Sequence, residues 1–334
     1  MSSNWGIFNK VAFGIAMTAT LFSAPARAYE AGWPGTEQRL GATLGGASAG
    51  VPPPGIYMFN QFVTYQAKVT GPNVPNGPNA KNVGVGAGLL FVPGWNFLGA
   101  TYNAVIAAPF VPVASVSSPA NSQIAGLHNT YVVPVELSWK LGDSGFFVKT
   151  GLGIYVPSGD ISGPTGLAGA GDPWWTFQPE FVVSYLKDGW NLTAFMFQES
   201  HTKNPLTGYR TGNIFHAELA ATKTIGKWTF GPVGYVAAQV SDDKSSAYYN
   251  YATNLNRYTR IAAGGLVGYN FGPAQLNVWL TNEFYHTASG KTPVAGVDLA
   301  TVPNGFSAFA SLSYRLWAPD DQQQKTAKIP LITK

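Results

Sequence analysis

The sequence predicts an all-β protein, a transmembrane antiparallel up-and-down β-barrel of about 12 strands. Hydrophobic residues make up 46% of the 334 residues and charged residues only 11%, whereas a typical soluble domain is about a quarter charged. The 39 Gly and 24 Pro would break helices throughout, and no segment is long and apolar enough to cross a bilayer as a helix. Turn signals divide the chain into short strands joined by alternately short and long connections.

The composition also excludes several classes of protein. Aromatic residues make up 14% of the chain, which is too many for a disordered protein. The formal net charge is +4 without a basic run, so we expect no nucleic-acid partner. The chain has no Cys, which excludes disulfides, thiolate metal sites and a cysteine nucleophile.

The N-terminus has the pattern of a secretory signal. Lys10 precedes an apolar run from Val11 to Phe22, and Ala26-Arg27-Ala28 follows it. The run is shorter than the roughly 20 residues that span a bilayer, and the final tripeptide is a small-x-small cleavage site. We therefore predict a cleaved signal peptide over 1–28 and export of the protein. The alternative is an N-terminal anchor helix.

Three further segments follow the signal peptide. A Gly-rich leader or plug covers 29–54, the barrel covers 55–317, and a flexible periplasmic tail covers 318–334. The predicted strands are 56–69, 82–92, 98–116, 128–141, 146–156, 173–186, 190–201, 211–225, 228–241, 257–271, 274–286 and 305–317.

The connections between these strands alternate in length. Short ones carry hairpin residues, as in Gly142-Asp143-Ser144-Gly145 and Lys187-Asp188-Gly189. The long polar connections are 70–81, 117–127, 157–172, 202–210, 242–256 and 287–304. Outer-membrane barrels have short periplasmic turns and long external loops. An even number of strands then predicts that both termini lie on the periplasmic side.

Alternation with a period of two assigns side chains to lipid or lumen. In 128–141, Val133, Val135, Leu137 and Trp139 share the predicted lipid face. Five of the seven Glu of the mature chain lie within strands, where a carboxylate has to face the lumen. The lumen-lining candidates are Glu136, Lys149, Gln178, Glu180, Glu199, His201, His216, Glu218, Gln239, Glu283, Arg315, Phe195, Phe197 and Tyr235, joined by Trp279, Tyr285 and Phe309.

Two interpretations of these lumen groups remain open. The polar ones brace the barrel wall as an ion-pair and hydrogen-bond network, or some of them line a permeation path. The aromatic ones fill a tapering barrel, or they contact a ring-bearing solute. A separate set of tryptophans lies mostly near strand ends, which is typical of interfacial girdles: Trp33, Trp95, Trp139, Trp174, Trp175, Trp190, Trp228 and Trp317.

Catalytic and metal-binding patterns are missing from the sequence. The four His, namely His128, His201, His216 and His286, show no zinc-binding spacing. There is no G-x-S-x-G elbow, and no P-loop or dinucleotide fingerprint precedes a helix. We therefore expect no enzyme activity, no catalytic residue, no cofactor and no metal.

Four blocks carry a resemblance to a known family: 52–57 (PPPGIY), 151–159 (GLGIYVPSG), 175–185 (WTFQPEFVVSY) and 231–235 (GPVGY). In order and spacing they resemble the Gram-negative outer-membrane family named for the meta-pathway of phenol degradation. The resemblance implies an outer-membrane barrel whose partners are membrane lipid and a hydrophobic or aromatic solute. Its implied role is similar to that of long-chain fatty-acid transporters.

The sequence favours passive uptake of hydrophobic or aromatic small molecules, through an aromatic-lined lumen or out through the barrel wall. The alternative is a structural or adhesive surface barrel with a closed lumen, in which the tyrosine-bearing loop 242–256 binds a partner. A third class is a soluble secreted carbohydrate-binding sandwich.

Overall fold

The computed structural model describes Glu30 and residues 35–46, 48–117, 122–251, 254–291 and 300–319. The predicted signal peptide, Trp33 and the tail beyond 319 lie outside these residues. No helix in the described part of the chain is long and apolar enough to span a membrane. The strands are β1 (Gly55–Thr70), β2 (Asn79–Val92), β3 (Asn96–Phe97), β4 (Ala100–Val116), β5 (Ser122–Leu127), β6 (Thr130–Lys140), β7 (Phe146–Val156), β8 (Thr176–Lys187), β9 (Trp190–His201), β10 (Ile214–Ile225), β11 (Trp228–Gln239), β12 (Asn254–Asn270), β13 (Ala274–Lys291) and β14 (Val302–Trp317), with one short 3-10 helix, η1 (Ala247–Tyr249).

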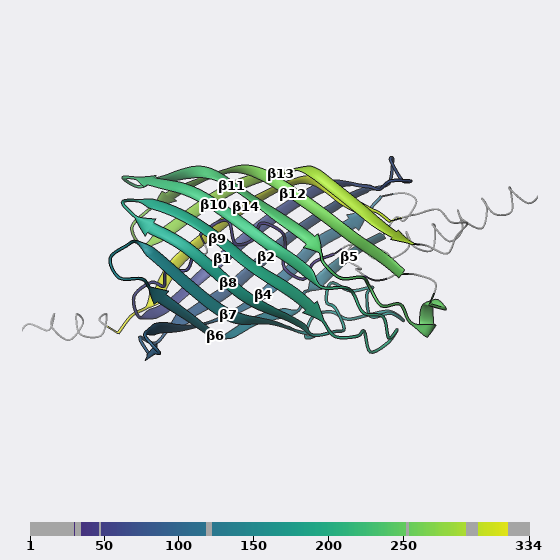
Figure 1. The fold of residues 1–334 in the computed structure, drawn as a ribbon, viewed down its shortest axis with the longest axis horizontal. Helices are drawn as coiled ribbons and strands as arrows, with labels where there is room; N and C mark the ends of the chain where they lie inside the picture. Colours follow the sequence, from purple (N-terminus) through teal and green to yellow (C-terminus); the bar gives the residue numbers. More distant parts are fainter. Residues whose placement is uncertain are drawn as a thin grey trace, which may run out of the picture.

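Twelve long strands close into an antiparallel barrel (Figure 1). Each pairs with its neighbours along the chain, and β1 pairs with both β2 and β14, which closes the ring. The remaining two strands are additions to the wall: β3 and β5 both pair with β4. Closure leaves no unpaired edge, as a barrel in lipid requires. The predicted fold class is therefore confirmed.

The two ends of the barrel differ in the length of their connections. Short turns lie at the left end in Figure 1, and the long connections with η1 lie at the right end. The short turns contain glycines with positive φ, such as Gly226 at 60° and Gly272 at 100°, a conformation that glycine adopts readily. One long connection was predicted wrongly, since 117–127 contains β5, which extends the pairing of β4.

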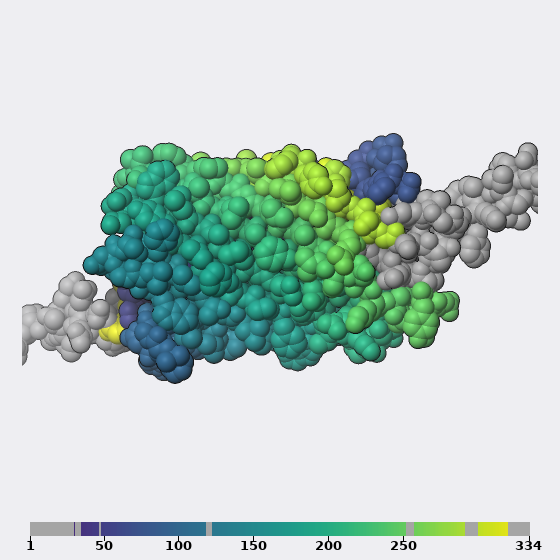
Figure 2. Space-filling view, in the orientation of Figure 1, coloured from purple at the N-terminus to yellow at the C-terminus, as the bar shows by residue number. Residues whose placement is uncertain are grey.

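The outer face of the barrel is apolar. Many large hydrophobic side chains on the strands are exposed, among them Phe62, Ile106, Phe181, Leu219, Val267, Val278 and Leu280. Figure 2 shows this face as a continuous wall over the strands coloured teal to green. So much exposed apolar surface would be an aggregation hazard in water, and it suits contact with lipid.

A bulge in β6 changes one predicted face. Val133 was predicted to face lipid, but only 1% of its surface is exposed, and it lines the lumen. Pro134 and Val135 are both exposed, because the pairing of β6 with β4 shifts between Val133 and Glu136. Pro134 has no backbone N–H to donate, so the ladder is interrupted there. The predictions for Val135 and Glu136 hold, since the bulge comes before Glu136.

A second bulge corrects the prediction for Tyr285. The pairing of β12 with β13 shifts so that Ile261 lies opposite Tyr285, whereas Ala262 lies opposite Glu283. Phe284 is the extra residue, and both Phe284 and Tyr285 are exposed. Tyr285 therefore points outward, while Trp279 and Phe309 are buried inside the barrel as predicted.

Most tryptophans at strand ends are exposed in the way that an interfacial girdle requires. Trp95, Trp175, Trp190, Trp228 and Trp317 are exposed and Trp139 is half-buried. Trp174 is an exception, since it is buried and its ring stands nearly perpendicular to that of His201.

A charge on the outer face should destabilise the barrel if this face meets lipid. Leu219 lies at the middle of β10 and is exposed. We expect Leu219→Arg to lower the free energy of unfolding in lipid vesicles by about 2–4 kcal/mol. Leu206, an exposed residue outside the strands, is the matched control, and Leu206→Arg should have little effect. Equal effects of the two variants in urea titrations would contradict the assignment of the lipid face.

Candidate functional site in the barrel lumen

The segment before β1 lies inside the barrel. We call Glu30, residues 35–46 and residues 48–54 the leader. Its Leu40, Leu44 and Ala49 are buried, and the two leucines pack in one cluster with Tyr235 and Trp279 of the barrel wall. An apolar segment inside the lumen removes these side chains from water, which is favourable. The leader therefore fills part of the lumen between the strands.

The leader runs from the loop end of the barrel to the short-turn end. Glu30 accepts hydrogen bonds from Asn204 and Thr207, which lie in the connection between β9 and β10 at the loop end. Ala49 lies beside Ser184 of β8, close to the turn that follows this strand. β1 then begins at Gly55. The first strand begins and the last strand ends at the same short-turn end, as the even strand number predicts, whereas Glu30 lies at the loop end because the leader crosses the lumen before the first strand.

Two carboxylates of the wall hold the backbone of the leader. Glu199 accepts hydrogen bonds from the backbone N–H groups of Glu37 (3.0 Å) and Gln38 (2.8 Å). Glu218 accepts hydrogen bonds from those of Gly41 (2.7 Å) and Thr43 (2.9 Å), and from the Thr43 hydroxyl (2.6 Å). Backbone N–H groups of an irregular buried segment need partners, and a charged acceptor makes the stronger bond.

Close contacts fix the middle of the leader against β13. The Trp279 indole donates to the carbonyl of Gly41 over 2.9 Å. At Gly45, a Cβ atom would lie 2.1 Å from the Trp279 ring, so only glycine fits there. Farther along, the Ala49 N–H donates to Ser184 Oγ over 2.9 Å.

Glu283 is the centre of a third polar cluster. Its carboxylate forms an ion pair with Arg260 and accepts hydrogen bonds from the hydroxyls of Tyr65 (2.9 Å) and Tyr235 (2.6 Å). The backbone N–H of Gly305 donates to the same carboxylate over 2.7 Å. This carboxylate is therefore fully occupied by groups of the wall.

The two remaining carboxylates also have partners in the wall. Glu136 forms an ion pair with Lys149 at 2.9 Å and accepts a hydrogen bond from Asn103. Glu180 accepts hydrogen bonds from Tyr131 and, over 2.9 Å, from Gln178. Because each of these carboxylates is paired or hydrogen-bonded, the cost of burying it in the wall is offset.

The other predicted lumen residues are placed as follows. His201 shares a hydrogen bond of 2.9 Å with Thr176, and His216 stacks on Phe197 with ring centroids 4.2 Å apart. Phe195 packs with Ala49 of the leader, and Gln239 donates to Asp243 over 2.7 Å. Arg315 is exposed near the end of β14, where it lies opposite Tyr57, a residue that lines the cavity. The remaining candidates are buried, and their part in permeation stays a prediction.

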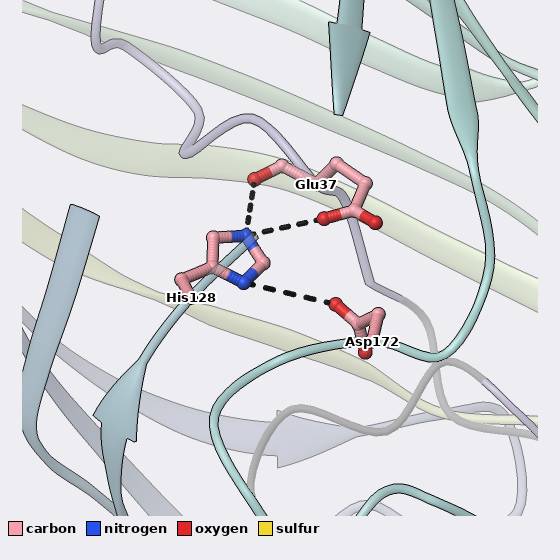
Figure 3. Close-up of side chains that lie close together, drawn as sticks. All are labelled: Glu37, His128 and Asp172. Atoms are coloured by element: carbon pink, nitrogen blue, oxygen red, sulfur yellow. Dashed lines mark hydrogen bonds and ion pairs between the residues drawn. The ribbon is translucent and has the colours of Figure 1, made fainter. Parts of the chain in front are cut away.

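Glu37, His128 and Asp172 come together where the leader, the start of β6 and the connection before β8 meet (Figure 3). His128 Nε2 lies 3.1 Å from a Glu37 carboxylate oxygen, and Nδ1 lies 3.0 Å from the Ala170 carbonyl and 3.9 Å from an Asp172 oxygen. Acceptors thus face both ring nitrogens. Because a carbonyl oxygen only accepts, Nδ1 is the donor to Ala170, and Nε2 faces two oxygens of Glu37. We assign no metal to this cluster.

A cavity of about 830 Å³ lies beside the leader. The leader forms one side, and β1, β2, β4, β6 and β7 form most of the other. The lining extends from His128, near the loop end, to Pro52 and Leu186, near the short turns. Its apolar part includes Phe59, Leu90, Val133, Phe147 and Phe195. Its size lies within the range of small-molecule sites, about 300–1,000 Å³.

At the loop end, Asp243 joins two external connections. Its carboxylate accepts hydrogen bonds from the Tyr209 hydroxyl (2.6 Å) and from the Gly212 N–H (2.7 Å). Burial disfavours the charged form and raises the pKa of Asp243 to about 7, although these hydrogen bonds act in the opposite direction. Burial likewise raises the pKa of Glu30 above its ordinary value.

Several of these residues could not be found by sequence reasoning. Glu37 and Arg39 lie in a Gly-rich stretch without periodicity, so no strand pattern assigns them a face. Tyr65 and Arg260 lie in strands whose alternation is weak, and Asp172 and Asp243 lie in connections. A signal did exist for the acids within strands, since five glutamates occur there in a chain with little charge.

A family model described as "Putative MetA-pathway of phenol degradation" matches residues 66–292. The chain belongs to this family. The match covers β2 to β13 completely and part of β1. No curated protein matches the sequence significantly.

Solved structures share the barrel fold at low sequence identity. An outer membrane channel from Pseudomonas putida F1 superposes with a TM-score of 0.66 at 12% identity, over 80% of this chain and 98% of that one. Two others are less similar: the β domain of the Bordetella autotransporter BrkA (TM-score 0.45, 14% identity, 78% and 100% coverage) and a mutant of the monoaromatic hydrocarbon channel TodX (0.42, 12%, 83% and 93%). The first similarity supports the fold, and the two weaker ones carry no conclusion.

Glu218→Gln should loosen the leader. The amide NH₂ would replace one acceptor oxygen in front of the donors of Gly41 and Thr43. Loss of charge-assisted hydrogen bonds costs about 1.5–3 kcal/mol. The chain has no Cys, so Ser48→Cys introduces a single thiol into the leader. We expect maleimide to label this thiol faster in Glu218→Gln than in the chain with Glu218. Asp143→Asn, at an exposed turn residue, is the control. An unchanged rate in Glu218→Gln would contradict the anchoring role.

Raising the pH should loosen the external connections around Asp243. A pKa raised from 3.8 to about 7 means that the folded arrangement binds a proton more tightly than the open one. The resulting stabilisation is complete below pH 4 and is lost as the pH rises through 7. A nitroxide label at Leu206 should therefore be more mobile at pH 8.5 than at pH 5.5. In Asp243→Asn the difference should shrink to what Glu30 contributes, and a pH-independent spectrum of the wild-type chain would refute this account.

Proposed function

We propose that this chain is a passive outer-membrane channel for hydrophobic and aromatic small molecules. Its membership of the phenol-degradation family and its closed barrel support this function. The observation that carries it is the cavity beside the leader, which extends from the loop end toward the short-turn end and is largely lined by aliphatic and aromatic side chains. Transfer of an apolar solute from water to such a lining lowers its free energy.

The leader acts in this proposal as a fixed partial plug. It packs against β11 to β14 and is held by glutamates of β9 and β10, and it leaves the side of the lumen next to β1 to β7 for the solute. The carboxylates of the wall are occupied by the leader, by cations or by tyrosines. They therefore bind few water molecules, and ions meet no continuous row of free polar groups. None of these groups needs to react with the solute.

The alternative function is that of a closed surface barrel whose loops bind a partner. The hydrogen bonds that anchor the leader favour a closed lumen, and Tyr248 and Tyr251 are exposed on the connection between β11 and β12. This alternative predicts no solute uptake, so a transport measurement decides between the two functions.

Uptake of labelled toluene, phenol and a long-chain fatty acid by cells with and without the gene tests the proposal. Ala107 and Ala108 are neighbours on β4; Ala107 lines the cavity, and Ala108 is exposed on the outer face. Ala107→Trp should reduce uptake several-fold by filling the path, while Ala108→Trp should not. Equal uptake in all strains, with the protein confirmed in the outer membrane, would refute the channel and favour the surface barrel.

A further inference from the structure

We propose that Arg39 forms an anion subsite in the cavity, which selects aromatic solutes that carry a carboxylate or phenolate group. This inference rests on the proposed channel function and narrows its substrate class. Arg39 lies on the leader between Gln38, whose N–H donates to Glu199, and Leu40, which is buried in the core. The backbone around it is therefore fixed, and its side chain lines the cavity.

The guanidinium of Arg39 has few partners. Its Cζ lies 3.9 Å from the centroid of the Tyr65 ring, and Nη2 donates to Ser307 Oγ over 3.2 Å. Nε is buried and has no acceptor among the described residues. Within the same part of the chain, no carboxylate oxygen lies within 4.0 Å of the Arg39 nitrogens, although Arg260 and Lys149 each have such a partner.

Two arginines and one carboxylate lie around the Tyr65 ring. Arg39 and Arg260 both lie near the Tyr65 ring, at 3.9 and 5.5 Å from its centroid. Only Glu283 lies among them, and its carboxylate is occupied by Arg260, two tyrosine hydroxyls and the Gly305 N–H. Glu199 and Glu218 accept hydrogen bonds from the leader backbone. None of these carboxylates is directed at Arg39.

A partly buried guanidinium with a buried Nε and no carboxylate partner is unfavourable, and a bound anion would compensate for it. The planar donor fork of arginine matches a carboxylate in particular. The apolar side chains of Val63 and Val111 line the same cavity, and they offer contact to a ring attached to the anionic group. A neutral hydrocarbon could use this apolar surface but would leave the guanidinium unpaired. The geometry therefore favours benzoate-like or phenolate-like solutes.

Binding of benzoate and of benzyl alcohol to the purified mature chain in detergent tests the subsite. The two probes are similar in size, and only benzoate is charged at pH 7.5. Calorimetry should show that benzoate binds about tenfold more tightly or better, which is the effect of one charge-assisted interaction. In Arg39→Gln the two affinities should become equal, while Arg39→Lys should keep part of the preference.

Arg257→Gln is the matched control, because it removes the same charge from an exposed residue that pairs with Asp242. It should keep the full preference for benzoate. Circular dichroism and the heat-dependent shift on gels establish that each variant is folded. If Arg39 only balances the charges of Glu199 and Glu218, Arg39→Gln will lower stability and wild-type benzoate will bind no better than benzyl alcohol, which overturns the subsite. Uptake of toluene separates the two proposals. If only the subsite is wrong, toluene uptake is unchanged. If the chain is no channel, it takes up neither toluene nor benzoate.

Discussion

An irregular segment inside a barrel must satisfy its backbone N–H groups without water, and this constraint explains much of the lumen. The leader solves it with two wall carboxylates, Glu199 and Glu218, which accept five hydrogen bonds from residues 37–43. These glutamates therefore have a structural reason to be inside a membrane barrel, where an unpaired carboxylate would be strongly unfavourable. The same bonds determine which half of the lumen is filled and which half stays open.

The asymmetry of the interior follows from this arrangement. Apolar residues of the leader pack against β11 to β14, and the cavity lies against β1 to β7. Bulges also fall on the cavity side, in the pairings of β2 with β4, β4 with β6 and β6 with β7. A bulge turns side chains from one face of the wall to the other, as it does for Val133. Local breaks in the ladder therefore help to set what the cavity exposes to a solute.

Sequence reasoning predicted the barrel well, because alternating faces and alternating connection lengths are local patterns. The inward position of Glu136, Glu180, Glu199, Glu218 and Glu283 follows from the same patterns together with the cost of a charge in lipid. The bulges could not be predicted, because one extra residue such as Phe284 does not change the composition of a strand. Val133 and Tyr285 were therefore assigned to the wrong face. The path of the leader could not be predicted either, because its contacts join residues more than 130 positions apart. The position of Arg39 in the lumen depends on the same contacts, so no reason to select it could be found in the sequence.

The central claim is that the leader is fixed inside the lumen and that solute passes beside it. Ala49 and Ser184 are in contact through a hydrogen bond of 2.9 Å, and the chain has no cysteine of its own. Toluene uptake by cells that carry Ala49→Cys and Ser184→Cys, before and after treatment with a short thiol cross-linker, tests both parts of the claim. The account predicts that the cross-link forms and that uptake persists. Failure of the cross-link, or loss of uptake once it has formed, would contradict it.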